Sequence, residues 1–152
     1  PASHAHGGMP SYGAPVPSLV KHGDVMMKEF PISTKTMLGR KLIFSGGGYF
    51  RLFPYPLIKR WSRQCEHDYL NHRVALLDGK EDGYLMSYIH PRDLDAGQPM
   101  LEGLPLKRKF KSYVGLQGAE QKLRKYLTDF KFVDVRTASK MIDWSRTPVI
   151  EL

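Results

Sequence analysis

The strongest constraint on the fold is a pair of amphipathic helical patterns separated by short apolar runs. Over residues 54–69, apolar side chains recur at helical spacing while the opposite face is charged. The second pattern covers residues 119–130, and its predicted buried face consists of Leu123, Tyr126, Leu127 and Phe130. Strand-sized apolar runs lie at residues 41–45 and 84–89. Because strands alternate with helices, the sequence predicts an α/β fold with parallel strands.

The predicted elements divide the chain into three segments. Residues 1–24 are rich in Pro, Gly, Ser and His without periodicity, and we expect an irregular arm there. Residues 25–136 hold the predicted strands and helices, and residues 137–152 form a C-terminal tail. The single Cys65 excludes an internal disulfide and a cysteine-based zinc cluster.

Within the middle segment, the first predicted strand covers residues 26–33 and contains Pro31, which indicates an edge strand or a strand end. Residues 84–89 are apolar or aromatic at nearly every position, as in a strand buried on both faces. Residues 91–118 are predicted to be mostly loop, and long loops in small domains are often functional. A closing strand is expected over residues 132–135.

A net charge of +8 is the unusual feature of the composition, and it favours polyanionic partners. The basic residues are dispersed except for one cluster, at Lys107, Arg108, Lys109 and Lys111. No groove-binding motif accompanies this cluster, so a solvated basic loop is the preferred interpretation and a nucleic-acid partner is disfavoured. No run reaches the ~18 apolar residues of a transmembrane helix, and no membrane span is predicted.

Two places have side chains suited to chemistry. The three glycines before Tyr49 would let the backbone approach a ligand, with the Tyr49 hydroxyl and the Arg51 charge beside it; a tight bend is the alternative. His90 ends the predicted buried strand, and polar residues at such strand ends often belong to active sites. Asp93 and Asp95 are placed to orient its imidazole, although a histidine bonded to loop carbonyls is an equal alternative.

Short motifs occur in a characteristic order from residue 12 to residue 132. They are Tyr12-Gly13-x-Pro15, Glu29-Phe30-Pro31-x-Ser33, Leu38-Gly39-Arg40, Gly46-Gly47-Gly48-Tyr49-Phe50-Arg51-Leu52-x-Pro54-Tyr55, Tyr88-x-His90-Pro91, Asp95-x-x-Gln98-Pro99, Phe110-x-x-Tyr113 and Asp129-Phe130-x-Phe132. Together they resemble the C-terminal region of NodB-type polysaccharide deacetylases, carbohydrate esterase family four, of the type encoded beside exopolysaccharide and exosortase genes.

The resemblance implies the C-terminal part of a distorted (β/α) barrel of the glycoside hydrolase/deacetylase type. It also implies a bacterial hydrolase that removes N-acetyl groups from a polysaccharide during exopolysaccharide biosynthesis. The implied cofactor is a divalent metal, with zinc as the first candidate. The family's Asp-Asp and His-x-x-x-His metal motifs would precede residue 1, so this segment alone is expected to bind no metal and to be inactive. Its implied partners are an N-acetylated polysaccharide and the missing N-terminal half of the barrel, and the bacterial compartment is left open.

By position, His90 matches the family's late-strand catalytic acid, and Ile89 before it would form an apolar wall. Tyr49, Arg51 and Asp93 are the further expected substrate contacts. The family usually continues His-Pro-Trp-Glu, whereas this chain has Arg92 and Asp93 after Pro91. The alternatives are a non-catalytic glycan-binding module that uses Tyr49 and Arg51, and a basic nucleic-acid-binding domain.

Overall fold

The computed structural model describes residues 16–71 and 84–152, which form a mixed α/β arrangement of five α-helices and two small sheets. The helices are α1 Gly47–Leu52, α2 Tyr55–Asn71, α3 Leu106–Tyr113, α4 Ala119–Asp129 and α5 Val135–Met141. The strands are β1 Ser18–His22, β2 Val25–Glu29, β3 Lys35–Met37, β4 Arg40–Leu42 and β5 Val149–Glu151. Two 3-10 turns, η1 Pro91–Asp93 and η2 Trp144–Arg146, complete the described elements. The motif at residues 12–15 lies outside the described residues.

The main core lies between α2, α4 and the segment that leads into α1. Tyr126 on α4 is fully buried, and its hydroxyl lies 2.7 Å from Ser62 Oγ on α2. The other buried members are Phe44, Phe50, Ile58, Trp61 and Phe130. Both predicted helices are confirmed, since α2 and α4 present their expected apolar residues to this core. Leu127 is the exception, because it is 54% exposed.

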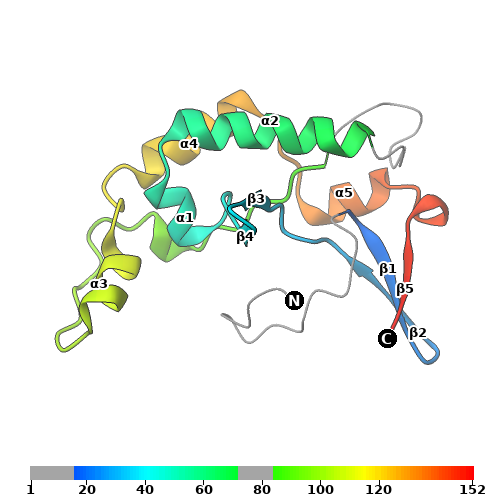
Figure 1. Ribbon diagram of the computed structural model, residues 1–152, viewed down its shortest axis with the longest axis horizontal. Coiled ribbons are helices and arrows are strands. Elements are labelled where there is room, and N and C mark those ends of the chain that lie inside the picture. The colour runs from blue at the N-terminus through cyan, green and yellow to red at the C-terminus, as the bar shows by residue number, and fades with distance from the viewer. Residues whose placement is uncertain (1–15, 72–83) are drawn as a thin grey trace.

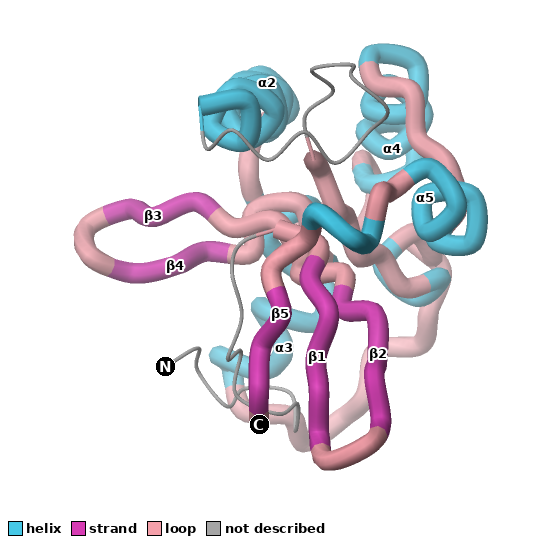
Figure 2. Tube along the Cα trace, turned by 90° about the vertical axis from the view of Figure 1, so that its right-hand side faces the viewer, coloured by secondary structure: helices cyan, strands magenta, loops and turns pink. Residues whose placement is uncertain are grey.

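A three-stranded sheet forms the opposite end of the molecule from α3 (Figure 1). Its order is β2-β1-β5, with β1 antiparallel to β2 and parallel to β5 (Figure 2). The expectation of an irregular segment up to residue 24 is therefore wrong for β1. β2 lies at a sheet edge and ends before Pro31, as the proline predicts. Residues 149–151, within the segment predicted as a C-terminal tail, form β5 and pair with β1.

The second sheet is the β3-β4 hairpin, which covers part of the strand predicted at residues 41–45. Phe44 and Ser45 lie in a turn, and α1 begins directly after it at Gly47, where the sequence predicted only a bend. The strand predicted at residues 84–89 is not assigned as a strand, and its pairing consists of the isolated bridge between Gly46 and Tyr88. Its residues are half-buried or exposed, so it is not a strand covered on both faces.

The segment at residues 91–118 contains η1 and α3, and is therefore less irregular than predicted. Residues 131–134 form no strand, because Asp134 caps α5 with its side chain accepting from Thr137 N–H. The described residues form no closed barrel. Within the same ranges, no helix combines the length and apolarity needed to cross a membrane.

The loop after α3 passes directly over the end of α1 at Gly115, which has a φ of +71°. A Cβ there would lie 2.5 Å from the Arg51 carbonyl oxygen. Gly103 has nearly the same φ, +72°, with nothing within 4 Å of a Cβ. The two glycines therefore share a backbone conformation and differ in packing.

We predict that Gly115→Ala lowers the free energy of unfolding by about 3 kcal/mol, from left-handed strain plus steric overlap. Gly103→Ala should introduce only the left-handed strain, and should therefore lower the free energy of unfolding by about 1 kcal/mol. Chemical denaturation of both variants measures the difference. Equal losses would show that the approach of Gly115 to Arg51 does not constrain the fold.

Candidate functional site

The segments that contain Gly46 and Tyr88 lie side by side, and the place where the two segments end is called the edge below. A parallel bridge pairs Gly46 with Tyr88, and the Gly47 N–H donates to the Tyr88 carbonyl at 2.9 Å. Parallel pairing makes both segments leave the pair in the same direction. The start of α1 and His90 consequently lie at the same edge.

Gly46 is required for this close pairing. A Cβ at Gly46 would lie 2.8 Å from Ile43 Cγ2 and 3.3 Å from the Tyr88 carbonyl oxygen. A side chain at this position would require the Ile43 side chain to move and the Tyr88 carbonyl to shift by a few tenths of an ångström. The glycine run therefore serves close backbone packing at its first position, Gly46.

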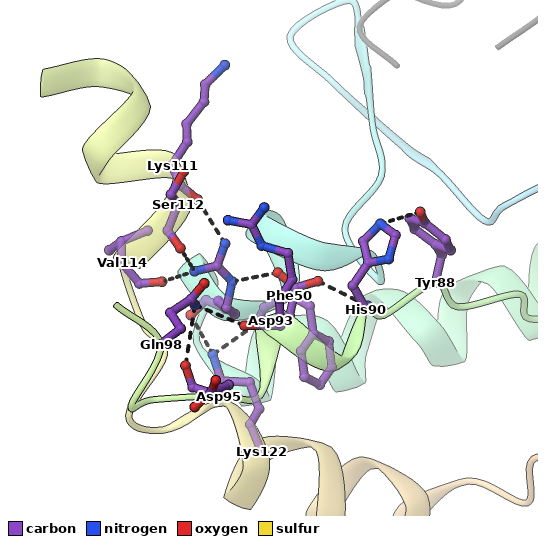
Figure 3. A network of polar contacts seen from close by, with 12 residues as sticks. Phe50, Tyr88, His90, Asp93, Asp95, Gln98, Lys111, Ser112, Val114 and Lys122 are labelled. Atoms are coloured by element: carbon purple, nitrogen blue, oxygen red, sulfur yellow. Dashed lines mark hydrogen bonds and ion pairs between the residues drawn. The ribbon is translucent and has the colours of Figure 1, made fainter. Parts of the chain in front are cut away.

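His90 is exposed at this edge and precedes the η1 turn. Its Nε2 contacts the Tyr88 hydroxyl, and the two rings meet edge to face with centroids 4.5 Å apart. Figure 3 shows the imidazole beside the Tyr88 ring, while only the His90 backbone reaches Asp93. Tyr88, two residues earlier on the same face of the extended segment, thus holds one ring nitrogen.

Neither predicted carboxylate orients the imidazole. Asp93 Oδ2 accepts from the His90 backbone N–H at 3.1 Å, which closes the η1 turn. Asp95 Oδ1 accepts from the Gly97 N–H at 2.9 Å. The expectation that Asp93 or Asp95 would orient the His90 ring is wrong, and the residue in that position is Tyr88.

Arg51 and Asp93 form a buried ion pair. Their side chains are 4% and 8% exposed, and Arg51 Nε lies 3.1 Å from Asp93 Oδ1. The Nε–H has no partner that satisfies hydrogen-bond geometry, so this contact is electrostatic. Because a single buried charge is far more costly than a pair, each residue requires the other.

The rest of the Arg51 guanidinium binds the end of α3 (Figure 3). Nη1 donates to the carbonyls of Ser112 and Val114 at 3.0 and 2.9 Å, and Nη2 donates to that of Lys111 at 2.8 Å. These carbonyls lie at the negative end of the helix, where a cation is favourable. The expectation that the bend presents Arg51 to a ligand does not match this geometry, which gives Arg51 a structural role.

Lys122 on α4 binds the carbonyls at the end of α1, as Arg51 binds those at the end of α3. Its Nζ donates to the carbonyls of Phe50, Arg51 and Phe53 at 3.0, 2.8 and 2.8 Å. Three acceptors satisfy all three ammonium protons. Burial lowers the pKa of Lys122, because desolvation penalises the charged form. α4 is thereby fixed against the C-terminal end of α1.

The remaining predicted site residues lie around this edge. Tyr49 is 43% exposed, and its ring stacks on Phe53 with centroids 5.7 Å apart. Ile89 is half-buried against the main core. Substrate contact by Tyr49, Ile89 and Asp93 stays a prediction, as does the catalytic role of His90. Within residues 16–71 and 84–152, no group of three His, Cys, Asp or Glu side chains gathers as a metal ion would require.

Sequence reasoning missed Lys122, Gly115 and the Tyr88 hydroxyl. Lys122 belongs to the polar face of a predicted helix, where its pattern equals that of any solvated lysine. Gly115 lies within the loop predicted at residues 91–118 and carries no local signal. Tyr88 was detectable, since it lies two residues before His90 in an extended segment and therefore shares its face.

The family described as "Domain of unknown function (DUF3473)" matches residues 1–140 of the chain. Neither the curated proteins nor the solved structures give a significant match.

We predict that Arg51→Gln and Asp93→Asn each lower the free energy of unfolding by about 3 kcal/mol or more, because each leaves a buried charge without its partner. The free energy of unfolding of the double variant should fall by less than the sum of the two single decreases, because no unpaired charge is then buried. A denaturation cycle with all four proteins measures this coupling.

Arg124→Gln is the matched control, because Arg124 pairs with Glu120 at 2.7 Å on an exposed surface. The free energy of unfolding of this variant should fall by less than about 0.5 kcal/mol. Additive losses at Arg51 and Asp93, or a loss at Arg51 as small as that of Arg124, would contradict the buried-pair assignment.

Proposed function

The chain belongs to this family of unassigned function, and from its motifs and geometry we propose that it forms the C-terminal region of a NodB-type polysaccharide deacetylase. The proposed reaction is hydrolysis of the N-acetyl groups of a bacterial exopolysaccharide. In this proposal the described residues supply part of a distorted (β/α) barrel, which a preceding part of a longer enzyme completes.

The observation that carries the proposal is the isolated parallel bridge between Gly46 and Tyr88. In (β/α) barrels, catalytic side chains extend from the carboxyl ends of parallel strands. His90 lies two residues after the bridge residue Tyr88 and is exposed. α1 and α2 follow the other bridge residue, Gly46, as helices follow strands in a βα unit. This arrangement is the one the resemblance leads us to expect around a catalytic histidine.

In the proposed reaction, His90 donates a proton to the amine nitrogen as the amide C–N bond breaks. The Tyr88 hydroxyl at Nε2 fixes the direction of the imidazole, so that the ring does not rotate freely at the exposed edge. Asp93 fixes the backbone of His90, and Arg51 neutralises Asp93. Ile89 would exclude water on one side, and Tyr49 would contact the sugar.

The implied divalent metal, with zinc as the first candidate, would polarise the amide carbonyl and lower the pKa of a bound water. The resemblance places the metal ligands in the preceding part of the enzyme, and the proposal gives this chain the proton donor.

A non-catalytic glycan-binding module is the second candidate. It is favoured by two exposed aromatic rings near the same edge, Tyr49 at 43% and Tyr88 at 44% exposure, because a tyrosine ring offers a binding partner both an apolar surface and a polar hydroxyl. The two candidates differ in acetate release. A binding module retains glycan affinity and releases no acetate, whatever residue occupies position 90.

We predict that His90→Ala lowers the kcat of the complete enzyme on an N-acetylated polysaccharide by about 10²–10⁴-fold, the usual contribution of a general acid. His90→Asn should be nearly as damaging, because an amide cannot deliver the proton. Acetate release measures kcat, and metal analysis should show unchanged stoichiometry.

His22→Ala is the control, since His22 ends β1 in the distant sheet and is also exposed. Its kcat should match that of the unmodified enzyme. Near-normal turnover in His90→Ala, or loss of bound metal from that variant, would show that His90 is not the acid.

A further inference from the structure

α3 is a helix with no buried residue. An isolated helix of eight residues is unstable in water, so its conformation depends on external contacts. The contacts found are at its C-terminal end, where Arg51 binds the carbonyls of Lys111, Ser112 and Val114. The outward face of α3 is left without a partner among the described residues, at the end of the molecule seen in Figure 1.

The exposed face of α3 is apolar along one line. Leu106 and Phe110 are four residues apart and therefore lie on the same side of the helix, with exposures of 84% and 56%. The preceding loop adds Met100 and Leu101, which are 56% and 61% exposed. Tyr113 holds this loop beside the helix, since its hydroxyl accepts from the Leu101 N–H at 2.8 Å and donates to the Pro99 carbonyl at 3.1 Å.

Four cations lie on the same helix as the apolar line, and Lys107 and Lys109 flank the line on its two sides. The four are Lys107, Arg108, Lys109 and Lys111, all exposed and all on α3. None forms an ion pair with a described residue. Glu102 is the sole acidic residue in the sequence between Asp95 and Glu120. These four apolar and four basic side chains are called the α3 patch below.

We propose that the α3 patch binds the surface of an anionic lipid bilayer, with α3 lying in the interface. Such a surface meets both chemistries at once: anionic headgroups attract the lysines and the arginine, while Leu106, Phe110 and the loop side chains enter the acyl boundary. A soluble polyanion would pair with the cations and leave four large apolar side chains in water. This inference does not rest on the deacetylase proposal.

The test compares binding of the protein to sedimented vesicles of phosphatidylcholine alone and of phosphatidylcholine mixed with phosphatidylglycerol. Binding is expected only with phosphatidylglycerol, and it should weaken as salt screens the charges. Lys107→Gln/Lys109→Gln should weaken partitioning by about 30-fold, from two lost headgroup attractions. Leu106→Ser/Phe110→Ser should weaken it by about tenfold or more, although every charge is kept.

The matched control is Lys131→Gln/Lys140→Gln, which removes the same charge from exposed positions after α4 and in α5. It should bind vesicles like the unmodified protein. All variants change exposed side chains, and unaltered circular dichroism and melting temperature should confirm their fold.

The proposal is overturned if vesicles of both compositions bind equally, if neither binds, or if the control loses as much affinity as the patch variants. Binding to heparin that depends on the α3 patch, without vesicle binding, would assign the patch to a soluble polyanion. Patch-dependent dimerisation without vesicle binding would assign it to a second copy of the chain.

Discussion

The buried pair of Arg51 and Asp93 joins three parts of the chain. Asp93 lies in the turn after His90, Arg51 lies in α1, and the remaining guanidinium protons bind the end of α3. The free energy that such a pair contributes is small, because desolvation of both charges offsets most of their attraction. The pair instead determines how the three parts are positioned, because an arrangement that separates them leaves a charge buried and unpaired. The edge at His90 depends on this condition.

A second cation extends the same principle. Lys122 on α4 binds the last carbonyls of α1. α1 and α3 therefore each end against a positive charge from elsewhere in the sequence, Lys122 for α1 and Arg51 for α3. Gly115 lets the α3 loop lie directly on the Arg51 backbone. Polar contacts therefore position the edge, while the apolar core between α2 and α4 supplies most of the buried surface beneath it.

Sequence reasoning found what is local and missed what is distant. The periodicity of α2 and α4 is visible in any short window, and both were predicted closely. β1 was missed although it pairs with the neighbouring β2, because its five residues include Ser18, Lys21 and His22 and show no apolar run. Its second partner, β5, is more than a hundred residues away. The burial of Arg51 depends on carbonyls about sixty residues further along the chain, and backbone acceptors leave no trace in a sequence. Its charge was therefore assigned to a ligand.

The position of His90 was predictable for a local reason, since an extended apolar run that stops at His-Pro places a polar side chain at a strand end. The surroundings of His90 were not predictable, because the Asp93 side chain accepts a hydrogen bond from the His90 backbone N–H and does not contact the ring. The same geometry connects the two proposals. Arg51 contacts both the Asp93 that holds His90 and the carbonyls that end α3. α3 cannot tilt relative to His90 without breaking either a buried ion pair or buried hydrogen bonds to a charged group, and each loss is large compared with thermal energy. A surface that binds α3 would consequently fix the direction in which the His90 edge faces.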